Sequence, residues 1–141
     1  MISNAQFEKE LELIISNALR EDVGDGDHTS LSCISSIAQG KAKLLVKEEG
    51  IIAGVLFAKQ VFSFVDNSLE IEIFINDGEQ VKYGDVVFHI SGNSQSILMA
   101  ERLVLNAMQR MSAIATKTAF FVDLLKGTKT TNTMYCYYVL L

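Results

Sequence analysis

One arginine stands out because of its neighbours on a predicted helix. At 100° per residue, Arg102 falls on one stripe with Asn106, Gln109, Ala113 and Thr116, and apolar side chains border that stripe. The positions three and four residues away hold leucine, methionine and asparagine, so helical spacing offers no carboxylate neighbour. A guanidinium stays charged and can grip a carboxylate or phosphate with two hydrogen bonds. The spacing therefore favours Arg102 as a binding residue for an anion, with a solvated helix edge as the structural alternative.

The stretch "EDVGDGDHTS", residues 21–30, is the second candidate, because it concentrates acids, two glycines and a histidine. A dinucleotide loop needs glycine where Thr29 stands, and the acids would repel phosphate. An EF-hand loop needs glycine at its sixth position, which neither possible starting aspartate provides. Acids and glycines are typical of a helix end followed by a turn, which is the role we expect. His28 and His89 are isolated in the sequence, and this favours structural, hydrogen-bonded histidines over metal ligands.

The helix that carries Arg102 is predicted from Ser96 to about Lys126, a span without glycine or proline, with one break expected near Ser112. Another helix is predicted at the N-terminus, where Ser3 and Gln6 have the spacing of a capping box. Its apolar residues recur at helical intervals and predict one buried face. These residues are Phe7, Leu11, Ile14, Ile15, Ala18 and Leu19.

Between the two helices the hydrophobic period changes to two. "KAKLLVK" (41–47) places lysines on one face of a strand, and "LEIEIFI" (69–75) places glutamates on one face of another. We expect half-exposed antiparallel strands whose opposite charges favour pairing. The apolar run 54–65 is long enough to favour a helix. Glycine turns at 77–78 and 83–84 then lead into a last strand at 86–90.

Composition restricts the class of protein. A chain of 141 residues with 49% hydrophobic residues is long enough for one domain with a real core. The net charge of −5 and the lack of a basic run argue against nonspecific nucleic-acid binding. No signal peptide or membrane span is visible, so a cytoplasmic protein without membrane contact is expected. Cys33 and Cys136 are too few and too far apart to suggest a disulfide framework or a zinc site.

The turn pair in "DGEQVKYGD", residues 77–85, is also compatible with a biotinyl or lipoyl carrier module. Such a module presents a lysine on a tight hairpin, yet no lysine occurs between Lys82 and Lys117. The sequence therefore argues against this class of binding module, although part of the barrel-like sandwich fold could be shared.

Four segments, in order and spacing, resemble quinolinate phosphoribosyltransferase, also called carboxylating nicotinate-nucleotide pyrophosphorylase. They are "ALREDVGDGDHTS" (18–30), "GIIAGV" (50–55), "DGEQVKYGD" (77–85) and "AERLVLNAMQRMSAIAT" (100–116). The resemblance implies an α/β (α+β) sandwich over residues 1–112, with an antiparallel sheet and helices. It implies that residues 113–141 are the stub of a truncated α/β barrel domain, with an atypical tail.

The resemblance also implies an activity. Family members join quinolinate to phosphoribosyl pyrophosphate with Mg²⁺, releasing pyrophosphate and carbon dioxide and leaving nicotinate mononucleotide for NAD biosynthesis. They are homodimers or higher oligomers in which the N-terminal sandwich covers the barrel of the neighbouring subunit. By this resemblance, Arg102 is the substrate-binding residue that reaches the neighbour's site. Fixed cations there would orient a dicarboxylate and stabilise the charge on the leaving pyrophosphate.

The sequence also departs from the family pattern. Beyond Lys129 the family continues into an Asp-Thr-Arg-Lys-Thr motif, whereas this chain reads "TTNTMYCYYVLL", and Ala113 replaces a usual glycine. No catalytic or metal-binding residue is therefore assigned, and we expect a truncated or frame-shifted copy that is inactive alone. A noncatalytic binding or regulatory module, or a related phosphoribosyltransferase-like homologue with a different substrate, stays open as an alternative.

Overall fold

The structure is a computed structural model, in which residues 4–23 and 34–126 are described. In chain order its elements are α1 (Asn4–Val23), β1 (Gln39–Leu45), β2 (Gly50–Ile51), α3 (Val55–Val65), β3 (Glu70–Ile73), β4 (Gln80–Val81), β5 (Val86–Asn93) and α4 (Ser94–Leu125). Over the described residues these are the three helices and the three strands that the hydrophobic periods predict, together with two strands of two residues each, β2 and β4, that were not predicted. The predicted capping serine, Ser3, and most of the acidic stretch, from residue 24 on, lie outside the described residues.

The larger sheet has the strand order β1-β5-β3, and both pairings are antiparallel. The expected direct pairing of the lysine-bearing and glutamate-bearing strands is therefore wrong, because β5 lies between them. The physical reason is burial: Val87, Phe88 and Ile90 of β5 are almost fully buried, so the most apolar strand occupies the centre. The charged strands take the edges, where charge also discourages pairing with other chains. A second, two-stranded sheet joins β2 and β4.

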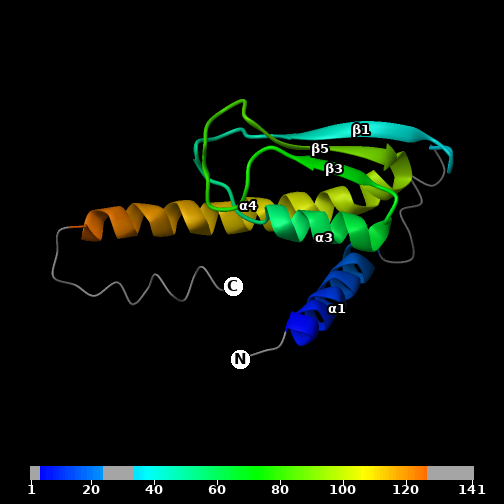
Figure 1. The fold of residues 1–141 in the computed structure, drawn as a ribbon, viewed down its shortest axis with the longest axis horizontal. Helices are drawn as coiled ribbons and strands as arrows, with labels where there is room; N and C mark the ends of the chain where they lie inside the picture. The colour runs from blue at the N-terminus through cyan, green and yellow to red at the C-terminus, as the bar shows by residue number, and fades with distance from the viewer. Residues whose placement is uncertain (1–3, 24–33, 127–141) are drawn as a thin grey trace.

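The fold is an α/β (α+β) sandwich of two layers, as predicted. Figure 1 shows the three-stranded sheet lying over α3 and α4, with α1 leading away from one end of the helical layer. The core fills the space between the layers and is built from aliphatic side chains and two phenylalanines. Helix α1 joins this core through Ile15 and Leu19, with Leu11 packed against its edge, whereas Phe7 and Ile14 are exposed. The predicted apolar face of α1 is thus buried over part of its length.

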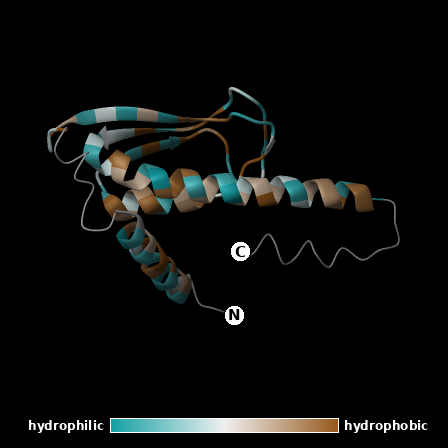
Figure 2. Cartoon of the chain, turned by 180° about the vertical axis from the view of Figure 1, so that it is seen from behind, coloured by the Kyte–Doolittle hydropathy of each residue, from teal (hydrophilic) through white to brown (hydrophobic). Residues whose placement is uncertain are grey.

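Helix α4 is continuous over 32 residues, so the expected break near Ser112 is wrong. It starts where Asn93 caps it: the side-chain oxygen accepts hydrogen bonds from the backbone N–H groups of Gln95 and Ser96 at 3.0 and 3.1 Å. The far end of α4 extends beyond the sheet and is largely apolar, as Figure 2 shows. Phe120 and Leu124 are each about 60% exposed there. The division between domains at residues 112 and 113 falls inside this unbroken helix and stays a prediction.

Candidate functional site on helix α4

Helix α4 has two opposite faces, and Arg102 lies on the outer one. The inner face packs against α3 and both sheets, with Ala100 and Val104 at most 1% exposed. At 100° per residue, Arg102 lies roughly opposite this buried row, and it is exposed. The fold therefore turns Arg102 away from the core of its own chain. This is the orientation that a residue binding an external anion requires.

The outer face of α4 carries more positive than negative charge between residues 101 and 117. Arg110 and Lys117 are both exposed on it, and Glu101 is the acidic residue in the same stretch. This basic surface belongs to a chain whose net charge is −5, so the cations are concentrated locally. Arg110 was not singled out from the sequence, although it follows Arg102 by about two helical turns, a spacing that could have drawn attention to it.

The predicted polar stripe is only partly a surface feature. Asn106, Gln109 and Ala113 are exposed beside Arg102, as expected. Thr116 differs, because its hydroxyl oxygen accepts a hydrogen bond from the backbone N–H of Ile51 at 2.9 Å. The last member of the stripe thus has a structural role inside the domain.

Thr116 belongs to a set of hydrogen bonds, here called the β2–α4 clamp, that joins the small sheet to the long helix. Ser112 Oγ accepts from the backbone N–H of Ala53 at 2.9 Å and donates to the carbonyl oxygen of Ala53 at 3.2 Å. A Cβ on Gly50 would lie 2.5 Å from Thr116 Oγ1, so glycine permits this approach. One threonine hydroxyl and one serine hydroxyl therefore hold α4 against β2 and the loop that follows it.

Helix α3, on which α4 rests, is capped from a distance. The carboxylate of Asp77 accepts hydrogen bonds from the backbone N–H groups of Val55 and Leu56 at 2.7 and 3.1 Å. The preceding residue, Gly54, has a φ of 97° and offers no side chain for this purpose. A carboxylate at a helix N-terminus satisfies free donors and interacts favourably with the helix dipole. Three of the four segments of the family resemblance therefore meet around β2 and hold α3 and α4 in place.

Near the start of α4 a second carboxylate ties the helix to the loop after α3. The hydroxyl and backbone N–H of Ser68 and the hydroxyl of Ser96 all donate to Asp66. These hydrogen bonds, those of Ser68 first, lower the pKa of Asp66 below its ordinary value of 3.8. The interaction holds the first turn of α4.

The described residues contain no candidate metal centre, since no three His, Cys, Asp or Glu side chains among them are grouped to hold an ion. His89 lies on the outer face of the larger sheet, with Nδ1 4.0 Å from Oε2 of Glu72 and its ring edge-on to Phe74. His28 lies outside the described residues. Among the described helices, none is long and apolar enough to cross a membrane.

Comparison with known proteins identifies the family. Residues 27–112 match the model of the quinolinate phosphoribosyl transferase N-terminal domain. The chain is 44% identical over 115 residues to quinolinate phosphoribosyltransferase [decarboxylating] 1 of Nicotiana glauca, covering 81% of this chain and 33% of that protein. It is 35% identical over 109 residues to a probable nicotinate-nucleotide pyrophosphorylase [carboxylating] of Bacillus subtilis, covering 77% of this chain and 37% of that protein.

Solved structures agree with the sequence comparison. The crystal structure of NadC from Streptococcus pyogenes superposes with a TM-score of 0.80 at 30% identity, over 91% of this chain and 48% of that one. The nicotinate-nucleotide pyrophosphorylase from Francisella tularensis gives a TM-score of 0.80 at 31% identity, over 88% and 44%. The chain spans about a third of the length of the curated relatives it matches. It belongs to the quinolinate phosphoribosyltransferase family and carries that family's N-terminal domain.

Proposed function

We propose that this chain supplies the substrate-covering domain of an enzyme that transfers a phosphoribosyl group from phosphoribosyl pyrophosphate to quinolinate. The reaction releases carbon dioxide and pyrophosphate and gives nicotinate mononucleotide. The observation that carries the proposal is the position of Arg102, exposed on the face of α4 opposite the core. Family membership and the excess of positive charge on the outer face of α4 support it.

In this proposal Arg102 binds an anionic group of a substrate held in the barrel of a neighbouring subunit. Both substrates are anions, and a planar guanidinium can orient a carboxylate or phosphate through two hydrogen bonds. The β2–α4 clamp holds α4 against the small sheet, and the Asp77 cap holds the start of α3, on which α4 packs, so both support the position of Arg102 relative to the sandwich. Orientation of this kind lowers the barrier because the entropy of alignment is lost on binding, before the chemical step.

Mg²⁺ enters the proposal only as a companion of phosphoribosyl pyrophosphate. The described residues do not fit a resident metal site, because they hold no grouped set of three metal-binding side chains. Mg²⁺ commonly keeps several waters and binds substrate phosphates with one or two carboxylates. Protein ligands for it would then lie in the rest of a full-length enzyme. On its own, the 141-residue chain is expected to form no nicotinate mononucleotide.

A chimera tests the role of Arg102. Residues 1–126 of this chain would replace the matching part of the Nicotiana glauca relative, and formation of nicotinate mononucleotide from quinolinate would be measured. Loss of one charge-assisted hydrogen-bonding group predicts that Arg102→Ala lowers kcat/KM by about 10- to 100-fold. Arg20→Ala is the matched control, because Arg20 is exposed on α1 and donates a hydrogen bond to Asn17 of its own helix at 3.1 Å. Equal activity of the two variants would contradict the assignment.

A mixing experiment tests whether Arg102 serves the neighbouring subunit. The Arg102→Ala chimera would be mixed with a chimera inactivated in its barrel part, and subunits would be allowed to exchange. In a two-fold dimer, mixed pairs restore one complete site each, so activity should recover to about a quarter of the wild-type value. No recovery, with exchange verified, would refute an intersubunit role.

A cytoplasmic location and a homodimeric or higher assembly are part of the same proposal. Cell fractionation tests the location, and sedimentation of the chimera tests the assembly.

A further inference from the structure

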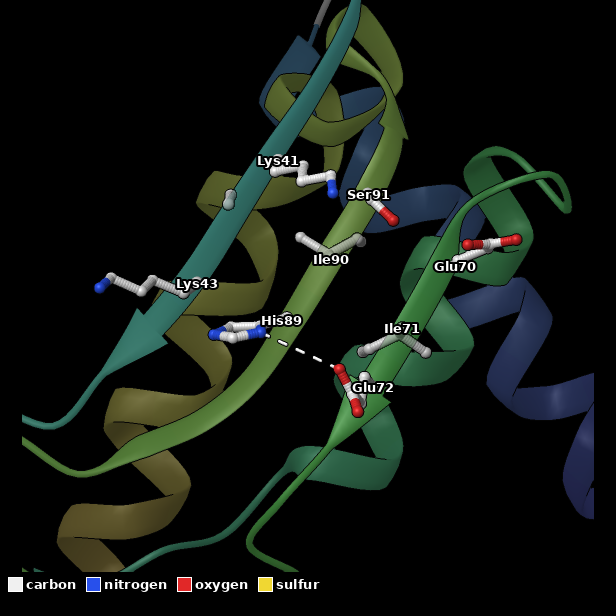
Figure 3. A pocket seen from close by; sticks show the side chains of 9 residues that line it. Lys41, Lys43, Glu70, Ile71, Glu72, His89, Ile90 and Ser91 are labelled. Atoms are coloured by element: carbon white, nitrogen blue, oxygen red, sulfur yellow. Dashed lines mark ion pairs between the residues drawn. The ribbon is translucent and has the colours of Figure 1, made fainter.

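The outer face of the larger sheet carries an ordered pattern of charge that the proposed function does not use. Side chains from β1, β5 and β3 align in two cross-strand rows, Lys41–Ser91–Glu70 and Lys43–His89–Glu72. The lysines form one column on β1, the glutamates form another on β3, and the serine and histidine of β5 lie between them (Figure 3). All four charged side chains are exposed, around an open hollow of about 620 Å³.

The two charged columns do not neutralise each other within one chain. Strands lie about 4.8 Å apart, so columns on β1 and β3 are separated by roughly 10 Å. Among the described residues, neither Lys41 nor Lys43 forms an ion pair, and Glu72 lies 4.0 Å from His89. The face is therefore polarised, with a positive edge and a negative edge at matched heights along the strands.

A polarised face of this kind is complementary to itself under one symmetry operation. A two-fold axis that runs parallel to the strands above β5 exchanges the β1 and β3 edges and keeps each row level with itself. It places Lys41 over Glu70 and Lys43 over Glu72 of a second copy, and each pair occurs twice. The other in-plane two-fold axis, perpendicular to the strands, would place lysine over lysine. We propose that this sheet face binds a second copy of the chain about the two-fold axis parallel to the strands.

The size of the face indicates a weak contact. Three strands and the length of β5 give a patch of about 14 by 27 Å. The area of this patch is below the roughly 800 Å² per partner that a stable interface buries. Exposed ion pairs supply most of the selectivity, so salt should suppress the contact. The face lies on the layer opposite the outer face of α4, which leaves Arg102 accessible while the sheets are joined. The proposal is therefore independent of the proposed enzymatic role.

Chemical cross-linking detects such a contact even when it is weak. In a Cys33→Ser/Cys136→Ser background of the 141-residue chain, Ser91→Cys places a thiol near the proposed axis, opposite its own copy. Face-to-face sheets lie about 10 Å apart, beyond the reach of a disulfide, so a short bismaleimide is the appropriate reagent. Gln60→Cys, on the exposed side of α3, is the matched control. We expect the Ser91→Cys dimer to form several-fold faster than the control at low salt, and equal rates would refute the proposal.

Charge reversal distinguishes this contact from association through the exposed apolar end of α4. If an exposed pair changes the dissociation constant about 1.4- to 5-fold, four pairs change it by fourfold to several hundredfold. Lys41→Glu/Lys43→Glu should therefore suppress cross-linking at residue 91, and so should Glu70→Lys/Glu72→Lys. The quadruple variant exchanges the two columns and should restore cross-linking. Circular dichroism checks that each variant is folded. Unchanged cross-linking in the double variants, or no recovery in the quadruple variant, would overturn the proposal.

Discussion

The hydroxyl of Thr116 should stabilise the domain even though it takes no part in binding. In Thr116→Val the shape of the side chain is kept, but the backbone N–H of Ile51 loses its acceptor, which lies 2.9 Å away in a partly buried position. Leaving a buried donor unsatisfied typically lowers the free energy of unfolding by about 1–3 kcal/mol. Because this site is only partly buried, we expect about 1–2 kcal/mol, toward the lower part of that range.

Urea denaturation followed by circular dichroism measures this effect. With a slope near 2 kcal/mol per molar, the midpoint should fall by about 0.5–1 M while the slope stays unchanged. Thr118→Val is the matched control on the same helix, since the hydroxyl of Thr118 donates to the carbonyl oxygen of Ile114, one turn earlier in α4 itself. That variant should stay within about 0.5 kcal/mol of the wild type. Equal midpoints for the two variants would show that the β2–α4 clamp does not stabilise the fold.

Three further predictions concern other parts of the chain. Asp77→Ala should lower the free energy of unfolding by about 1–2 kcal/mol, and Asp77→Asn, which keeps an acceptor oxygen, by less, as urea titration would show. The lowered pKa of Asp66 contributes stability that is present above pH 3.8 and is lost as pH falls through the folded value. Asp66→Asn should therefore lose less stability than the wild type between about pH 5 and pH 2, measured as urea midpoints at each pH. Phe120→Ser/Phe121→Ser should reduce self-association in light scattering, because both rings are about 60% exposed; undiminished association would exclude the end of α4 as its cause.

The sequence predicted those elements whose structure follows from the local hydrophobic pattern. The apolar run that became α3, the strand β5 and the long helix α4 were all recognisable from period and from the positions of glycine. The exposure of Arg102 followed from the same arithmetic, since the apolar side of a helix faces the core. Its role in binding stays a prediction, because that depends on a neighbouring molecule.

The errors arose where distant segments decide the outcome. Alternating charges showed that β1 and β3 are half-exposed strands, but not that β5 separates them. Ser112 suggested a helix break, yet its hydroxyl is satisfied by Ala53, 59 residues earlier, so the helix continues. Asp77 looked like a turn residue, and its action as a cap on α3 requires a contact across 22 residues that no local pattern reveals. Such tertiary hydrogen bonds become visible only once the chain is folded.

The unbroken course of α4 makes it a lever. Its 32 residues span about 48 Å, and Arg102 lies roughly 21 Å along the axis from the Thr116 anchor point. Because Ala100 and Val104 pack into the core, the sandwich moves with this part of the helix. A tilt of about 5° between the sandwich and the exposed end of α4 would carry the guanidinium sideways by nearly 2 Å, enough to lose a productive alignment with a bound acid. A rearrangement of the short loop beside Gly50 could change the angle between the sandwich and the exposed end of α4, and this change would be magnified at Arg102. Mutations that never touch a ligand could in this way alter recognition of it.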